Sequence, residues 1–128
     1  MKIYTSYFDN IKIENNRVFI SIAGKSPEFF TNLTNENPKQ FKSCKKLAPK
    51  YVWWKEWHDK KLSNEWYIEK YNETVLLKLN AQEIFNEWQS YGNEIVLLCW
   101  EGKNEFCHRH LVADWLSKEL NIEINELE

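Results

Sequence analysis

Three residues with chemically useful side chains stand next to one another in the second half of the chain: Cys107, His108 and Arg109. A thiol with a lowered pKa can act as a nucleophile, and an imidazole can move a proton. A guanidinium can bind phosphate or carboxylate through two parallel hydrogen bonds. Glu101, a short way upstream, could serve as a general acid or base or accept a hydrogen bond from a ribose or an amine. We therefore expect Cys107, His108 and Glu101 to form a catalytic group and Arg109 to bind the ligand.

The elements around these residues predict where they lie. Ile95 to Trp100 form a continuous apolar run, which is typical of a strand covered on both faces of a parallel sheet. After a short turn, apolar residues recur at helical spacing and predict a helix that begins near Cys107: Leu111, Val112, Trp115, Leu116 and Leu120. The carboxyl ends of parallel strands are where such sheets bind ligands, so the triplet is expected at a binding crevice.

A purely structural role fits the same residues. Cys107 could be simply a small buried residue. In the catalytic alternative, the dipole of the helix that begins there and the charge of Arg109 would favour its thiolate form. His108 could donate a capping hydrogen bond, and Arg109 could pair with Glu101 across the turn. Cys99, within a run of aliphatic residues, is expected in the core. The sequence leaves the catalytic and the structural alternatives open.

A metal site is the next alternative, because Cys99, Cys107, His108 and His110 are close in sequence. On a helix, each residue advances roughly 100°, so His108 and His110 point about 200° apart and cannot both face one ion. His108 shares the apolar face and should point inward, whereas His110 should face solvent. Since at most three ligands remain for a tetrahedral site, we expect no metal.

Polar residues also follow the first two predicted strands, namely Thr5, Ser6, Ser21 and Lys25. In a parallel sheet these strand ends lie on the same edge as Glu101, so we expect them to bind a small anionic ligand such as a nucleotide or a sugar phosphate. The chain has only three glycines and no glycine-rich phosphate loop. Standard binding of NAD or ATP is therefore not expected, and no cofactor is predicted.

The overall pattern predicts an α/β fold: a small three-layer, Rossmann-like sandwich with a mainly parallel sheet. We expect a single domain over residues 1–128, with a long, mostly irregular insertion at about 25–62 that contains all three prolines. The strands and helices are expected at 2–8, 17–23, 64–78, 81–91, 95–100, 107–120 and 122–125.

Composition narrows the classes of protein further. The net charge is −2, and no run of 18 apolar residues or signal peptide is visible, so we expect a cytoplasmic protein without a membrane partner. Three cysteines in such a chain favour free thiols over a disulfide framework. The pattern gives no information on oligomeric state.

Several short motifs, in order along nearly the full chain, resemble the domain of unknown function 488 family. They are Thr5-Ser6-Tyr7-Phe8, Ile20-Ser21-Ile22 with Pro27, Leu47-Ala48-Pro49, Tyr67 and Tyr71, Leu97-Leu98-Cys99-Trp100-Glu101, and Phe106-Cys107-His108-Arg109-His110-Leu111. The resemblance implies a Rossmann-like α/β fold with the Cys-His-Arg signature at the edge of a cleft, and it implies no particular reaction. Many members have glycine in the turn after the first strand, where this chain has Ser6-Tyr7-Phe8. The details of the family's pocket at this turn are therefore not transferred to this chain.

The insertion supports a rival hypothesis. Between Lys39 and Lys61, eight lysines stand against two acidic residues, which gives a local charge of +6 and leaves −8 on the rest of the chain. Trp53, Trp54 and Trp57 alternate with these charges, and basic residues with aromatic ones can bind single-stranded nucleic acid. Alternatively, the tryptophans fold back over the sheet and the lysines are simply solvated.

The leading hypothesis is therefore a protein that binds, and could act on, a small anionic or nucleotide-like ligand in a cleft lined by the Cys-His-Arg motif. The second hypothesis is a nucleic-acid-associated module that uses residues 39–61, with the motif structural.

Overall fold

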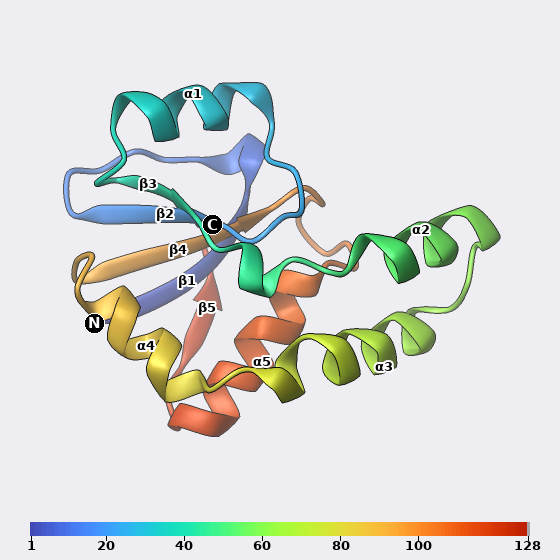
Figure 1. The fold of residues 1–128 in the computed structure, drawn as a ribbon. Helices are drawn as coiled ribbons and strands as arrows, with labels where there is room; N and C mark the ends of the chain where they lie inside the picture. Colours follow the sequence, from blue (N-terminus) through green and yellow to red (C-terminus); the bar gives the residue numbers. More distant parts are fainter. Residues whose placement is uncertain (128) are drawn as a thin grey trace.

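A five-stranded parallel sheet forms the centre of the protein, whose computed structural model describes residues 1–127 (Figure 1). The strands run in the order β3-β2-β4-β1-β5, and every neighbouring pair is parallel. Their bounds are β1 Lys2–Tyr7, β2 Arg17–Ser21, β3 Phe41–Ser43, β4 Glu94–Cys99 and β5 Ile124–Glu126. Strand β4 lies in the middle, which explains why its sequence is apolar on both faces.

Each face of the sheet carries its own hydrophobic core. Val96 and Leu98 of β4 pack on one side with Phe8 and Phe30. The alternate residues of β4 (Ile95, Leu97 and Cys99) pack on the other side with residues of the helices there. The result is a three-layer α/β arrangement, as predicted.

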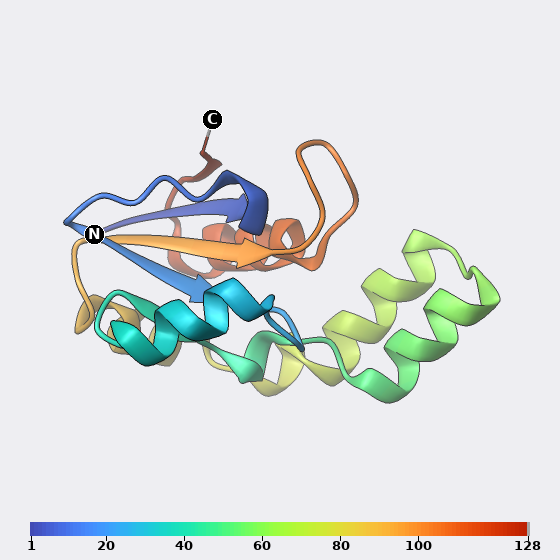
Figure 2. The ribbon, with the colours of Figure 1, turned by 90° about the horizontal axis from the view of Figure 1, so that it is seen from above.

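The helices divide between the two faces, as Figures 1 and 2 show. Helix α1 (Glu28–Glu36) and the short 3₁₀ turn η1 (Phe8–Asn10) cover one face. Helices α4 (Ala81–Gln89) and α5 (His108–Leu120) cover the other. Among the described residues, no helix is long and apolar enough to cross a membrane.

A helical hairpin extends beyond the carboxyl edge of the sheet. It consists of α2 (Tyr51–Lys60) and α3 (Asn64–Thr74), and both views show it projecting from the body of the protein (Figures 1 and 2). Two 3₁₀ turns join it to the rest, η2 (Lys45–Leu47) before it and η3 (Leu76–Lys78) after it. The hairpin thus stands beside the strand ends where a ligand is expected.

Residues 25–62 are more regular than the sequence analysis predicted, since they contain α1, β3, η2 and α2. The prediction of a mostly irregular insertion was wrong because these elements are short and their apolar residues show no sustained period. The strand order also departs from the Rossmann order, in which the strand beside β2 is the first one. Here β4 occupies that position.

The hairpin is fixed to the body by a buried hydrogen bond: the Tyr71 hydroxyl donates to the Leu47 carbonyl oxygen at 2.6 Å. Replacement of Tyr71 by phenylalanine leaves that carbonyl buried without its donor, which should lower the free energy of unfolding by about 1–3 kcal/mol. Denaturant unfolding measures the change. The matched control is Tyr91→Phe, which removes an exposed bond to Glu87 and should cost less than about 0.5 kcal/mol. Equal losses in both variants would contradict this role for Tyr71.

Candidate functional site

The connections after β2 and β4 leave the sheet toward opposite faces. The chain leaves β2 toward α1 on one face and leaves β4 toward α5 on the other. Since neighbouring parallel strands with diverging connections open a crevice at their carboxyl ends, this is where the topology predicts a ligand. The structure has a pocket at this position.

The pocket has a volume of about 560 Å³ and is mostly apolar, within the range of roughly 300–1,000 Å³ that is typical of small-molecule sites. Three segments form it: the loop after β2, the helical hairpin, and the stretch from the end of β4 to the start of α5. Its lining residues are Ala23, Gly24, Lys25, Pro49, Tyr51, Trp54, Trp57, Tyr67, Cys99, Trp100, Glu101, Phe106, Cys107 and His108. It therefore contains all three residues expected to be catalytic, together with Lys25.

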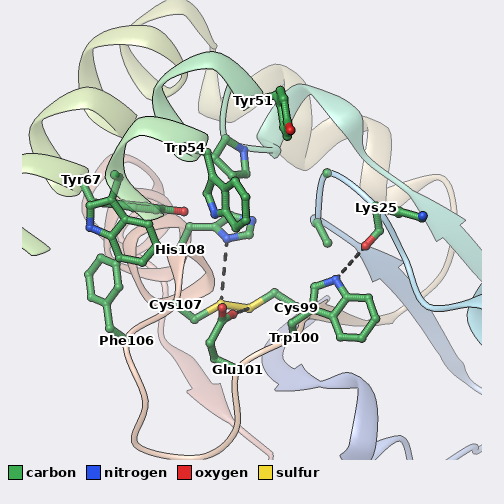
Figure 3. A pocket seen from close by; sticks show the side chains of 14 residues that line it. Lys25, Tyr51, Trp54, Tyr67, Cys99, Trp100, Glu101, Phe106, Cys107 and His108 are labelled. Atoms are coloured by element: carbon green, nitrogen blue, oxygen red, sulfur yellow. Dashed lines mark hydrogen bonds between the residues drawn. A yellow bond between two sulfur atoms is a disulfide. The ribbon is translucent and has the colours of Figure 1, made fainter. Parts of the chain in front are cut away.

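Aromatic side chains make up much of the pocket wall. Trp57 and Tyr67 of the hairpin contact Phe106, which precedes α5, with ring centroids 6.1 and 5.0 Å from it. Trp100 donates its indole N–H to the carbonyl oxygen of Lys25 at 2.7 Å and so joins the loops after β2 and β4 (Figure 3). These contacts hold the three segments of the wall in place.

Sequence reasoning missed most of this aromatic wall. Helix α2 buries Trp53 and turns Trp54 and Trp57 to the pocket, and Tyr51 at its start is 68% exposed. The signal was present, because the sequence pattern associates the tryptophans of the basic segment with binding of single-stranded nucleic acid. What the sequence does not contain is the angle of the hairpin that brings them to the strand ends.

The polar part of the pocket lies where β4 ends and α5 begins. Cys99 is the last residue of β4 and Cys107 is the N-cap of α5, and their sulfur atoms are joined as a disulfide in the structure (Figure 3). The expectation of free thiols was therefore wrong for this pair, although Cys44 is free. An Oε2 atom of Glu101 lies 3.8 Å from the Cys99 sulfur, so its carboxylate borders the same group.

His108 is buried and points inward, as its helical position predicted, whereas His110 is partly exposed. The Nε2 atom of His108 lies 2.7 Å from the carbonyl oxygen of Ile22. A carbonyl oxygen can only accept, so Nε2 carries the hydrogen and Nδ1 has a free lone pair, 3.9 Å from the Cys107 sulfur. Burial lowers the pKa of His108 to about 4, against the opposing effect of the Ile22 hydrogen bond. The imidazole is therefore neutral at pH 7.

Arg109 is completely buried and does not line the pocket. Its guanidinium binds both carboxylate oxygens of Glu126, at 2.7 and 3.1 Å, and donates to the carbonyl oxygens of Glu101 and Gly102. It also lies 3.3 Å from the Cys99 sulfur. The carboxylate paired with Arg109 is thus that of Glu126 and not that of Glu101.

The hydroxyl residues expected to bind a ligand also lie outside the pocket lining. Thr5 donates to Glu126 at 2.9 Å, and Ser6 is bound to Asn10. Ser21 accepts a hydrogen bond from Ser26 at 2.7 Å, at the end of β2. The structure therefore brings together Glu101, Cys107, His108 and Lys25 of the predicted site, and it does not bring Arg109, Thr5, Ser6 or Ser21 to the pocket wall.

One group of side chains in the described residues has the composition of a metal site. Atoms of Cys99, Cys107 and His108 that can bind a metal all lie within 4.8 Å of one another, and all three residues are buried. This is the three-ligand set that the sequence analysis had considered and judged too small.

Together, the parallel sheet and the pocket define an α/β protein with a cysteine-containing pocket at the carboxyl edge of its central strand. The family model described as the active DUF488-N3 subclade matches residues 23–120, which include every residue that lines the pocket, and the chain belongs to the DUF488 family. No curated protein and no solved structure matches it.

The pairing of Arg109 with Glu126 predicts a pH-dependent stability. Burial opposes ionisation of Glu126, but the hydrogen bonds from Arg109 and Thr5 prevail and lower its pKa from the ordinary value of 4.5. A carboxyl group whose pKa is lowered by folding stabilises the protein above its unfolded pKa, and that contribution disappears as the pH falls through the folded pKa.

Accordingly, Glu126→Gln should lower the free energy of unfolding at pH 7 by roughly 2–3 kcal/mol, since it removes charged hydrogen bonds from a buried guanidinium. The difference from the unmodified protein should shrink as the pH falls below the ordinary pKa of the carboxyl group. Denaturant unfolding between neutral and acidic pH measures both effects. The control is Glu123→Gln, which alters a nearby exposed carboxylate and should change little. A loss that does not vary with pH would contradict the assignment.

Proposed function

We propose that the pocket binds a small, planar, nucleotide-like ligand. The observation that carries the proposal is the aromatic wall of a pocket of about 560 Å³ whose polar groups are concentrated at one end. Aromatic rings stack on nucleobases through their faces, with little dependence on the base. Lys25 is the cation of the lining and suits an anionic group, while Glu101 suits a ribose hydroxyl or an amine.

Chemistry on the bound ligand is a further part of the proposal, and it requires the reduced form of Cys107. In that form its thiol lies at the N-terminus of α5, where the helix dipole favours a thiolate. The unprotonated Nδ1 of His108 is near enough to accept the thiol proton after a small movement. Glu101, which lines the pocket, would then serve as general acid or base toward the bound ligand. The description of the matched subclade as active agrees with a reactive site.

The cytoplasmic location expected from the sequence belongs to the same proposal. Thiols stay reduced in that compartment, and a nucleophilic Cys107 depends on reduction.

Ligand binding can be measured through tryptophan fluorescence, because Trp54, Trp57 and Trp100 all line the pocket. We expect at least one compound from a panel of nucleobases, nucleosides and nucleotides to quench the fluorescence saturably. Trp54→Leu should weaken that binding by at least about fivefold, since stacking on an aromatic side chain contributes about 1–3 kcal/mol. Lys25→Ala should weaken binding of nucleotides more than binding of nucleosides.

The control for this measurement is Trp66→Leu. Trp66 is a partly buried tryptophan of α3 that packs on Trp53 and lies outside the pocket lining. Calorimetry on the same variants gives an independent measure of affinity. Absence of binding across the panel, or equal weakening by Trp54→Leu and Trp66→Leu, would refute the proposal.

A second candidate function is binding of single-stranded nucleic acid along the basic segment 39–61. The observation in its favour is that exposed Tyr51 stacks on Trp54 at 6.3 Å next to Lys50, so a basic and aromatic surface continues into the pocket. Against it, Lys46 and Lys55 contact Glu87 and Asp59, and Lys45 donates to the Gly24 carbonyl oxygen. These contacts reduce the positive charge available to phosphates, so this function ranks second.

Salt dependence separates the two functions. If lysines neutralise phosphates, affinity for a single strand should fall steeply with salt, by roughly 0.7 logarithmic units per phosphate for each tenfold increase. Binding of a small ligand inside the pocket should respond much less. We expect weak or no binding of oligonucleotides at physiological salt. Micromolar binding that Lys45→Glu, Lys46→Glu and Lys50→Glu together abolish, and that Trp66→Leu leaves intact, would place nucleic acid first.

A further inference from the structure

The ligand atoms of Cys99, Cys107 and His108 converge on one point at the wall of the pocket. The Nδ1 atom of His108 lies 3.9 Å from the Cys107 sulfur, and all three atoms lie within 4.8 Å of one another. In a tetrahedral zinc site, Zn–S distances of about 2.3 Å and Zn–N distances of about 2.0 Å place the ligand atoms roughly 3.5–3.8 Å apart. The observed separation of nitrogen from sulfur is close to that value.

The hydrogen bond of His108 prepares its ring for a metal. A metal-binding histidine usually donates its other N–H to a carbonyl or carboxylate, which fixes the tautomer and the orientation of the ring. Here Nε2 donates to the carbonyl oxygen of Ile22 at 2.7 Å, and Nδ1, with its lone pair, faces the two sulfur atoms. A buried histidine with only a structural role would need the hydrogen bond to Ile22 but would not need a lone pair that faces the sulfur atoms.

The surrounding charges suit a divalent ion held by two thiolates. The guanidinium of Arg109 lies 3.3 Å from the Cys99 sulfur, where it can donate to a thiolate, and it is itself paired with Glu126. A divalent cation, two thiolates, Arg109 and Glu126 together sum to zero charge. A buried site of this composition therefore carries no net charge, which limits the electrostatic cost of desolvation.

The backbone also accommodates two separate ligands. The Cα atoms of Cys99 and Cys107 are 7.3 Å apart, whereas disulfides usually join residues whose Cα atoms are about 4.4–6.8 Å apart. This spacing leaves room between the two backbones for two sulfur atoms that are not bonded to each other. The two cysteines thus suit one shared ion.

We propose that reduced Cys99 and Cys107 bind a divalent metal ion together with Nδ1 of His108. Two thiolates and one imidazole are ligands that suit zinc, and three protein ligands leave a fourth position open. Because all three residues line the pocket, that position faces the ligand space, where Glu101 is the neighbouring carboxylate. In this metal-bound state Cys107 and His108 are ligands, so a water molecule bound at the fourth position, and not the Cys107 thiolate, would be the group activated for attack on a ligand in the pocket.

Conversion between the disulfide and the metal-bound form balances in protons and electrons. Reduction of the disulfide by a dithiol or phosphine adds two electrons and two protons and gives two thiols. Metal binding then releases the two thiol protons, since the thiolate is the form that binds. Oxidation of the two thiolates by a two-electron oxidant such as a peroxide restores the disulfide and releases the ion. The disulfide and the metal site are therefore two states of the same three residues.

Metal binding can be tested without knowledge of the ligand. The full chain is reduced with a phosphine, freed of metal with a chelator under anaerobic conditions, and titrated with zinc and with cobalt. We expect one equivalent of zinc per chain by elemental analysis. Cobalt should give the intense visible absorption of a tetrahedral site and a thiolate charge-transfer band. Addition of zinc should protect Cys99 and Cys107 from alkylation and leave Cys44 reactive, which is a readout on the unmodified protein.

Variants assign the ligands. Cys107→Ser and His108→Gln should each weaken zinc binding by more than about 100-fold, since even the outer partners of a ligand are worth roughly 10- to 100-fold. The matched control is Cys44→Ser, which removes the third cysteine and should bind zinc unchanged. The proposal fails if the reduced chain binds no zinc, if Cys44→Ser abolishes binding, or if the cobalt form lacks the thiolate band. Since the readout is metal content, this result is independent of whether the pocket binds a nucleotide.

Discussion

The site depends on the buried guanidinium of Arg109. Its hydrogen bonds reach the loop after β4 through the carbonyl oxygens of Glu101 and Gly102, and they reach β5 through Glu126. It also contacts the sulfur atom of Cys99. One side chain from the first turn of α5 therefore fixes the end of the central strand, the loop that follows it and the edge strand. Because a buried guanidinium is costly without its partners, these three segments are held in one arrangement.

The position of β4 determines what this arrangement can do. As the central strand, β4 exposes neither face to water, and its carboxyl end borders the pocket through Cys99. After β4 the chain continues to α5, which lies on the face of the sheet opposite α1. This divergence opens a crevice beside the loop after β2. Cys99 and Cys107 are eight residues apart in sequence, and their sulfur atoms lie together there because β4 ends close to where α5 begins. The close placement of the two sulfur atoms is thus a result of the strand order.

The sequence was informative where a signal is local. The unbroken apolar run of β4 predicted a central strand, and helical spacing predicted that His108 points inward. The partner of Arg109 could not be predicted in this way, because Glu126 lies on an edge strand whose register depends on the whole sheet. The helix at 64–78 was predicted and corresponds to α3, but the short elements between residues 25 and 62 gave no sustained period, so α2 and most of the aromatic wall were missed. Long-range packing, which no local pattern contains, decides both features.

The two halves of the pocket come from different parts of the chain. The polar end is made by residues 99–108, which are fixed by the sheet and by Arg109, whereas much of the aromatic wall is made by the α2 and α3 hairpin. The hairpin projects from the body and is joined to it at its base, as Figures 1 and 2 show. Mutations in the hairpin can therefore change the shape of the pocket while the sulfur and imidazole groups stay in place. Under the proposed function, the hairpin would thus set which molecule fits the pocket, and the polar end would set the chemistry done on it.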